Sequence, residues 1–394
     1  MGDTARSDDK PRAAKGAGKA PKAPKRKRAP SPPSPVLRRR IRLAIGIVFG
    51  VALSAAVALA ITLTVFSARK GPGEATGVVV DIPKGATKDE VARILADEGL
   101  VSNPSLMRLY WSLSAHGDPI AGEHVLLGGS TPDELALSLT HASSRKKVKV
   151  VIPEGFNRFA IAERLERLGV SSRRSFLGAS SDPLLLEALE VPAPAGRGPA
   201  SAEGFLFPAT YELQVDSPAA DIVERLVRES NTRWKRLADE HKEAIASLAE
   251  RFGWSRAEIV TLASMVEKEA AVDDERPTIA GVFLNRLAFD DFKPKLLQSD
   301  PTSGYGCLAA PDEAPSCVDY AGKITPAINR DKLNRYSTYS NEGLPPGPIA
   351  NPGERSLLAV LDPSVSRFLY FVAVGGGRHK FSETLEDHNR AIHK

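Results

Sequence analysis

The chain of 394 residues has a hydrophobic content of 42% and a formal net charge of +5. This size and apolar content allow two or three globular units with cores of their own. The charge is uneven, because residues 1–40 hold thirteen Lys and Arg against three Asp, a net of +10, and the rest therefore carries −5, the difference between +5 and +10. The excess of positive charge belongs to the N-terminal arm, which argues against a nucleic-acid partner for the remainder.

The arm, residues 1–40, is rich in proline and poor in large apolar residues, so it cannot bury enough surface to fold and is predicted to be disordered. Residues 43–66 are uncharged, long enough for a hydrocarbon core of about 30 Å and longer than the core of a cleaved signal, about 7 to 15 residues. We therefore predict one transmembrane helix at residues 41–66 and a linker at residues 67–76. Arginines gather on its N-terminal side, so the positive-inside rule places the arm in the cytoplasm and the rest outside.

The next part of the chain contains an internal repeat, residues 78–106 and 148–176, with an offset of 70 residues. Each copy predicts a β-branched strand with Ile-Pro-x-Gly, a short amphipathic helix ending at Gly, a second helix and a return strand. We predict two α+β modules, at residues 77–145 and 146–235, the second joined to the unit that follows. Their element order resembles LysM-like modules, which grip amino-sugar chains. Glycan binding and a role as packed spacers are both open.

Residues 255–272 predict an apolar-periodic helix that ends in two glutamates. Ser255 and Glu258 form a capping box at its start, and the apolar residues that follow recur at helical spacing as one buried stripe. At about 100° per residue, Glu267 and Glu269 lie roughly 200° apart, so they flank the stripe and cannot both point into one cleft. Two interpretations are open from spacing: solvated glutamates, or one general acid whose pKa is raised by apolar neighbours.

The run ASMVEKEAAV resembles the helix end of the lytic transglycosylases, where a glutamate is followed by two small residues and an apolar one. That register matches Glu269. Ala270 stands where the soluble enzymes usually carry serine, so a hydrogen bond from that hydroxyl is expected to be missing.

A second helix opens at residue 276, with proline in its first turn. Turn-rich loops follow at residues 296–302 and 336–353. Residues 367–384 predict a hairpin whose turn is the three glycines 375–377. These glycines lack the following helix and acidic residue of a nucleotide site, so we reject dinucleotide binding.

Seven motifs behind one membrane span, EGFLFPATYEL, ASMVEKEA, GVFLNRL, LQSDPT, YSTY, GLPPGPIANPG and YFVAVGGGRHKFSET…HN, resemble the YceG-like family of endolytic murein transglycosylases. The resemblance covers nearly everything from residue 78 onward. It implies an α+β fold with a single N-terminal transmembrane helix, LysM-like modules, and a mixed α+β catalytic domain, residues 236–394, with a lysozyme/transglycosylase-like glutamate helix. It also implies work at the inner membrane, with the catalytic domain periplasmic, beside the peptidoglycan synthases.

The implied reaction is cleavage of the MurNAc–GlcNAc bond in nascent glycan strands, leaving a 1,6-anhydro end. Ordinary glycosidases need two carboxylates, whereas here the sugar's own C6 hydroxyl replaces water, so one suffices. Glu269 would protonate the glycosidic oxygen and then take the proton from that hydroxyl. No metal or cofactor is expected, since no histidine shows a close ligand pairing. The resemblance nominates Gln298, Asp300, Tyr339 and Asn351 as substrate-binding residues. Glu267, on the other flank of the helix, and His379, as polar lining from the hairpin, are also predicted to contact the substrate.

The sequence departs from the family at two places. Ser337 stands where the family usually has Asn, and residues 307–317 look like an inserted loop. Cys307 and Cys317 lie in this loop, on the side of the membrane predicted to be oxidising, so we expect a disulfide rather than free thiols.

Two alternatives to the transglycosylase remain open. One is a membrane-anchored, non-catalytic glycan-binding scaffold of the cell-wall synthesis machinery, and the other is a muramidase that uses water. The products of peptidoglycan digestion separate all three, because they are anhydro-ended for the transglycosylase, absent for the scaffold and reducing-ended for the muramidase.

Overall fold

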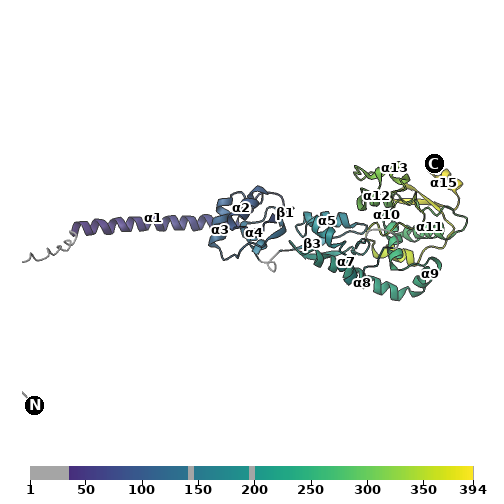
Figure 1. The fold of residues 1–394 in the computed structure, drawn as a ribbon, viewed down its shortest axis with the longest axis horizontal. Helices are drawn as coiled ribbons and strands as arrows, with labels where there is room; N and C mark the ends of the chain where they lie inside the picture. Colours follow the sequence, from purple (N-terminus) through teal and green to yellow (C-terminus); the bar gives the residue numbers. More distant parts are fainter. Residues whose placement is uncertain (1–34, 141–145, 195–199, 394) are drawn as a thin grey trace, which may run out of the picture. The chain divides into compact units, whose positions relative to one another are not determined.

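The computed structural model describes residues 35–140, 146–194 and 200–393, which form a mixed α+β fold (Figure 1). In these residues the strands pair into three antiparallel sheets, β1 with β2, β3 with β4 and β5 with β6. The predicted α+β class is confirmed. Most of the arm predicted to be disordered, residues 1–34, lies outside the described residues.

An apolar helix, α1 (Pro35–Ala68), begins the described chain. Its stretch Val36–Ala68 is long and apolar enough to cross a membrane. Among the helices of the described residues, only this one meets both conditions. The helix begins before the predicted span of residues 41–66, because proline occurs only at its first residue, where the missing N–H costs nothing, and no proline follows to break it.

The first module folds as a strand, two helices and a return strand, followed by a third helix. Thr87 caps α2 in a capping box with Glu90, and Asn103 caps α3. Fully buried apolar side chains, among them Leu95 and Trp111, form a core of its own. The elements are β1 (Gly77–Ile82), α2 (Lys88–Asp97), α3 (Pro104–Leu113), β2 (Gly122–Leu127) and α4 (Pro132–Thr140).

The second module repeats this order around a second core. Its strands are again antiparallel, with Val150 opposite Tyr211, and one additional helix precedes the return strand. The predicted order of strand, helix, helix and strand is therefore present in both copies. The elements are β3 (Lys147–Val151), α5 (Arg158–Arg167), α6 (Arg173–Ala179), α7 (Pro183–Ala188) and β4 (Thr210–Gln214).

A buried ion pair joins the two modules. His124 Nδ1 lies 2.6 Å from Asp216 Oδ2, and the two side chains are 5% and 10% exposed. The other ring nitrogen, Nε2, lies 2.8 Å from the carbonyl oxygen of Ile120. The ring is therefore held between a carboxylate and a backbone carbonyl group at the junction. Asp216 also accepts a hydrogen bond from the N–H of Val125, which fixes the carboxylate at the junction.

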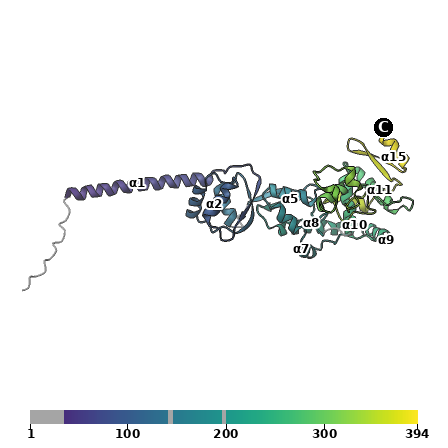
Figure 2. The ribbon, with the colours of Figure 1, turned by 45° about the horizontal axis from the view of Figure 1, so that its top comes forward.

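The C-terminal part is mostly helical and is built around α10. In Figure 1, α10 and α11 lie side by side in the green part of the ribbon, and the turned view of Figure 2 keeps them together. α10 also packs against α12 and α14, and α15 packs on the hairpin β5–β6. The elements are α8 (Ala219–Glu240), α9 (Lys242–Phe252), α10 (Arg256–Glu269), η2 (Asp273–Glu275), α11 (Arg276–Ala288), α12 (Asp300–Ala309), η3 (Pro315–Cys317), α13 (Pro326–Arg330), α14 (Glu354–Leu361), β5 (Tyr370–Gly375), β6 (Arg378–Ser382) and α15 (Leu385–Ile392).

The helix predicted at residues 255–272 is present but shorter. Ser255 and Glu258 form the predicted capping box. The helix ends at Glu269, because Ala270 has an extended backbone with φ of −77° and ψ of 113°. The chain then turns into η2, so Glu269 is the last helical residue and lies where three elements meet.

Two further predictions can be compared with the structure. Glycines 375–377 all have positive φ and connect β5 to β6, so the hairpin is confirmed. Cys307 and Cys317 form the expected disulfide. The prediction that both cysteines lie in a loop is wrong for Cys307, which belongs to α12 and is buried, since its side chain packs with Ala314 and Ile328 in a small core of their own.

Asp216→Ala should destabilise the protein. It removes the carboxylate that binds His124 and that accepts the Val125 N–H, which leaves this buried N–H without its acceptor, so we expect the free energy of unfolding to fall by about 3 kcal/mol. Thermal unfolding of the full chain in detergent measures the loss. Asp118→Ala is the control, because Asp118 pairs with Lys88 on the surface with its side chain 95% exposed. Equal melting temperatures for both variants would contradict a stabilising junction.

Candidate active site

A cleft of about 510 Å³ opens at the C-terminal end of α10. Its walls come from α10, α11, the segment before α12, the loop that carries Tyr339, the hairpin and α15. Polar groups and aromatic rings share the surface, as expected of a site for a polar ligand with a carbon skeleton. The lining residues are Glu269, Arg286, Gln298, Asp300, Tyr339, Tyr370, Phe371, Val372, Ala373, His379, Leu385, His388, Asn389 and Ile392.

Glu269 is the carboxyl group that α10 brings to this cleft. Burial raises its pKa, and the neighbouring charge of Asp300 raises it further. A hydrogen bond from Ser299 and the charges of His379 and Arg286 act in the opposite direction. The net shift is upward, which is what a general acid working near neutral pH requires.

Ser299 provides a hydroxyl hydrogen bond to Glu269, whereas residue 270 is an alanine. Its Oγ donates to Glu269 Oε1 over 2.5 Å. Thr338 holds the backbone of this segment, since its carbonyl oxygen and Oγ1 accept the N–H groups of Gln298 and Ser299 at 3.1 and 3.0 Å. Gln298 has a φ of 54°, a conformation that costs energy for a residue with a side chain and that the surrounding contacts must maintain.

Asp300 and Tyr339 are neighbours on the cleft wall. Asp300 is the first residue of α12 and accepts a hydrogen bond of 2.8 Å from Asn329 Nδ2. Burial raises the pKa of Tyr339 well above its usual range, and its hydrogen bond to Asp300 contributes to that increase. The tyrosine therefore stays a neutral phenol, able to stack on a sugar and to hold Asp300 in place.

His379 lies on β6 and is fixed by η2. Its Nδ1 donates to Glu275 Oε2 over 2.8 Å, and its backbone N–H also reaches the Glu275 carboxylate. Both side chains are about nine-tenths buried, at 11% and 10% exposure. These contacts hold the hairpin against η2, and the imidazole of His379 lines the cleft together with Glu269.

Glu267 has a different environment, although only one residue separates it from Glu269. It forms an ion pair of 3.1 Å with Arg276, and the two side chains are 6% and 9% exposed. It also accepts hydrogen bonds from the Gly353 N–H and the Ser356 hydroxyl. Glu267 is not among the residues that line the cleft, and its contacts hold the loop before α14.

Asn351 is fully buried and also lies outside the cleft lining. Its Oδ1 accepts the Leu206 N–H at 2.8 Å, and its Nδ2 donates to the carbonyl oxygen of Phe156 and to Glu203. It therefore links the loop of residues 336–353 to the second module.

Glu203 is the buried acid at the centre of this link. The Arg158 N–H donates to both of its oxygens, and Asn351 Nδ2 donates to Oε1. Burial raises its pKa to about 7, although the hydrogen bond from the Arg158 N–H lowers it. The sequence analysis did not single out this group, because its burial comes from contacts between distant parts of the chain.

Several residues of the cleft were missed by the sequence analysis. Arg286 and Ser299 lie inside two of the family motifs, GVFLNRL and LQSDPT, so the signal was present although their roles were not. Tyr370, which stacks on His388 of α15 with ring centroids 5.4 Å apart, is likewise the first residue of the motif YFVAVGGGRHKFSET, although its role in the cleft was not predicted.

Comparisons with known proteins support one family. A sequence model of the YceG-like family matches residues 80–394. The chain is 28% identical over 333 residues to a Bacillus subtilis protein named endolytic murein transglycosylase, which covers 81% of this chain and 85% of the relative. It is equally similar, 28% over 337 residues, to a Streptococcus pneumoniae protein of the same name, of which it spans 58% of the length.

A solved structure also matches. The crystal structure of a yceG-like protein from Listeria monocytogenes superposes with a TM-score of 0.51 and 28% sequence identity, covering 81% of this chain and 100% of that one.

Replacing Glu267 or Glu269 by glutamine should have opposite effects on stability. Glu267→Gln breaks a buried ion pair and should cost about 3 kcal/mol, a moderate value because Arg276 keeps its contact with Asp273. Glu269→Gln should leave stability unchanged at acid pH and raise it at pH 8, because a carboxyl whose folded pKa is raised destabilises the fold once it ionises. Thermal unfolding at both pH values measures this. Equal losses of stability in Glu267→Gln and Glu269→Gln would contradict the different environments of the two glutamates.

Glu203 should make stability fall with rising pH. The pKa of Glu203 is about 7 in the folded chain and ordinarily 4.5, so the penalty is absent below about pH 4.5, grows toward neutral pH and reaches at most about 3 kcal/mol. Glu203→Gln should flatten this part of the profile, measured by urea unfolding from pH 4.5 to 8. If Glu203→Gln has the same pH dependence of stability as the wild type, ionisation of Glu203 does not destabilise the fold, and the prediction is wrong.

Proposed function

The chain belongs to the YceG-like family, and on that premise we propose that it is an endolytic murein transglycosylase. The enzyme is a lyase that acts on peptidoglycan and cleaves the MurNAc–GlcNAc bond within nascent glycan strands without water. The observation that carries the proposal is Glu269, a carboxyl with a raised pKa at the end of a buried helix, in a cleft large enough for sugar rings.

We propose that Glu269 acts first as acid and then as base. It gives its proton to the glycosidic oxygen, the bond from C1 to that oxygen breaks, and the electron pair stays on the leaving sugar. The C6 hydroxyl oxygen of the same MurNAc then bonds to C1, and its proton passes to the Glu269 carboxylate. The proton returns to where it began, so neither water nor a cofactor is consumed and the product carries a 1,6-anhydro end.

Four side chains on the cleft walls are proposed as substrate contacts. Gln298, Asp300, Tyr339 and His379 all line the cleft, where amide, carboxylate, phenol and imidazole groups can bind hydroxyl and acetamido groups of the sugars. Asp300 is the other carboxylate of the described cleft lining, and Asn329 and Tyr339 already bind it. This favours a role in holding substrate over a role as second catalytic carboxylate.

Glu267 and Asn351 were predicted to bind substrate, and we propose instead that they hold the cleft walls. Glu267 binds Arg276 and the loop before α14, and Asn351 is buried against the second module. Neither side chain lines the cleft.

The two modules are proposed to be LysM-like. The strand, helix, helix, strand order and the antiparallel pairing in each copy support this assignment. Such modules would retain the enzyme on glycan strands and lead them toward the cleft.

We also propose a single-pass anchor in the inner membrane, formed by α1, with the arm cytoplasmic and the catalytic domain periplasmic. The length and composition of α1 support the anchor, and the arginines before it support the orientation. This places the cleft beside the peptidoglycan synthases, whose nascent strands are the substrate.

Glu269→Gln tests the reaction. It keeps the shape of the side chain but removes the transferable proton, so turnover should fall by about 10⁴-fold, the upper end of general acid catalysis. Mass spectrometry of digested peptidoglycan measures anhydro-ended products. Wild-type amounts from this variant would overturn the assignment of the acid, and reducing ends from the wild-type enzyme would replace the transglycosylase by a muramidase.

Protease accessibility tests the orientation. Protease added to spheroplasts should digest the chain beyond about residue 67 and leave the basic arm intact, detected with tags at the two ends. A protected C-terminal domain would contradict the proposed topology.

A further inference from the structure

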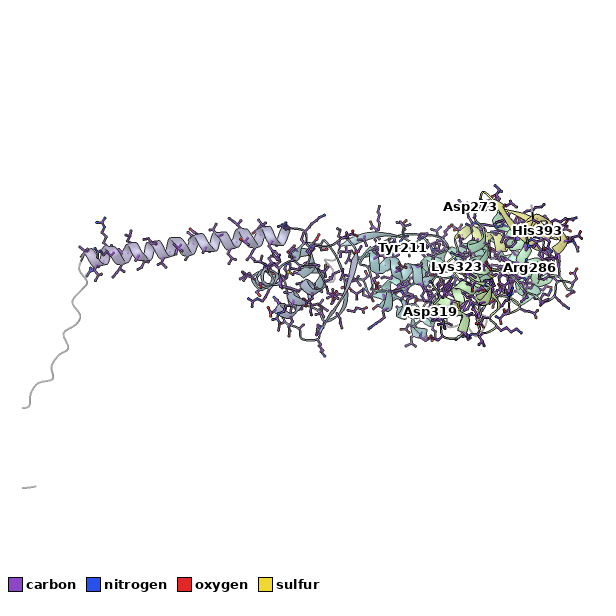
Figure 3. All side chains as sticks on the ribbon, turned by 90° about the horizontal axis from the view of Figure 1, so that it is seen from above. Tyr211, Asp273, Arg286, Asp319, Lys323 and His393 are labelled. Carbon is purple, nitrogen blue, oxygen red and sulfur yellow. A yellow bond between two sulfur atoms is a disulfide. The ribbon has the colours of Figure 1, made fainter. Side chains whose placement is uncertain are left out.

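Arg286 is a buried cation in the wall of the cleft that the mechanism above does not use. It comes from α11, is 6% exposed, and is labelled in Figure 3. Its Nε donates to the carbonyl oxygen of Leu369 at 2.6 Å, and its Nη1 donates to that of Leu297 at 2.5 Å. Both acceptors are backbone carbonyl groups, so they orient the guanidinium without neutralising it.

The contact with Leu297 leads directly to the acid. Leu297 is followed by Gln298, whose φ of 54° is strained, and then by Ser299, whose hydroxyl donates to Glu269. Thr338 holds this segment on one side and Arg286 on the other. A strained segment keeps one conformation only when its surroundings fix it, so the Ser299 hydrogen bond depends on both anchors.

We propose that Arg286 is a positioning residue for Glu269. It holds residues 297–299 so that Ser299 reaches the carboxyl group, and its charge favours the carboxylate that remains after the proton has been transferred to the leaving sugar. The inference rests on the proposed function, in which one group is acid and then base and therefore passes through an ionised state in a buried site.

The charges around Glu269 are consistent with this role. Asp300 at the start of α12 disfavours the carboxylate, and His379 on β6 and Arg286 on α11 favour it. Burial lowers the pKa of Arg286 to about 10, which still leaves it protonated at neutral pH. His379 is already bound to the Glu275 carboxylate, so Arg286 is the cation without such a neutralising partner among these described neighbours.

The pH dependence of kcat/KM tests the proposal with the full chain in detergent and anhydro-ended products as the measure. The alkaline limb reports loss of the proton from the acid. Arg286→Met should lower kcat/KM by roughly 10²-fold and move this limb to higher pH by roughly one unit, because the carboxylate is no longer favoured. Ser299→Ala should move the alkaline limb in the same direction and lower kcat/KM by roughly 10-fold. Arg286→Lys keeps the charge and should leave the limb close to that of the wild type.

Arg256→Met is the matched control. Burial also lowers the pKa of Arg256 to about 10, and its hydrogen bonds are to Asn231 and Ser230, away from the cleft. It should lower the melting temperature and leave the limb where it is in the wild type.

The results separate this inference from the proposed function. Turnover by Glu269→Gln at the wild-type rate would overturn the function and the inference together. If that variant is inactive, an unmoved limb in Ser299→Ala and Arg286→Met would overturn the inference alone and reduce Arg286 to a structural residue. If Arg286→Met does not fold, Arg286→Gln takes its place, because it keeps an N–H donor and removes the charge, and it should move the limb in the same direction.

Discussion

The carboxyl group of Glu269 is held in a buried position at the last residue of a helix, and the arrangement of the C-terminal part depends on keeping it there. Burial disfavours its ionised form, while a serine hydroxyl, an arginine and a histidine favour it. These groups come from separate elements, namely the segment before α12, α11 and the hairpin. Each needs its own anchor, because a contact from a loose segment would not persist against chain entropy.

The end of α10 carries two glutamates with opposite environments, and helix geometry explains the difference. Residues two apart on a helix point to nearly opposite sides. Glu269 therefore meets the cleft, while Glu267 meets Arg276 and the loop before α14. The ion pair also fixes the start of α11, the helix that carries Arg286. The last turn of α10 thus carries both the candidate acid, Glu269, and the glutamate that holds the start of α11, Glu267.

Buried polar links connect the cleft to the modules before it. The hydrogen bond from Asn351 to Glu203 joins the loop of residues 336–353 to the second module. The contact between His124 and Asp216 joins the second module to the first. Each link is closed by complementary donors and acceptors, which is the condition under which a buried polar group does not destabilise a fold. Buried hydrogen bonds therefore connect the described parts of the two modules with each other and with the cleft.

The sequence alone determined what local patterns control. Helical periodicity and a capping box predicted α10, three glycines predicted the hairpin turn, and the repeat predicted two modules of the same order. These features depend on residues a few positions apart, for which propensity and turn chemistry are informative. The register of a short motif also singled out Glu269 over Glu267.

The tertiary structure alone decided which side chains meet. Ser299 binds the carboxyl group of Glu269, Asn351 is buried away from the cleft, and Arg286 holds the segment that carries Ser299. The last motif of the sequence, ending in His388 and Asn389, marked α15, but only the structure shows that this helix forms a wall of the cleft. Contacts of this kind join residues that are tens to more than a hundred positions apart, and their energy comes from burial and from hydrogen bonds that exist only once the cores have packed.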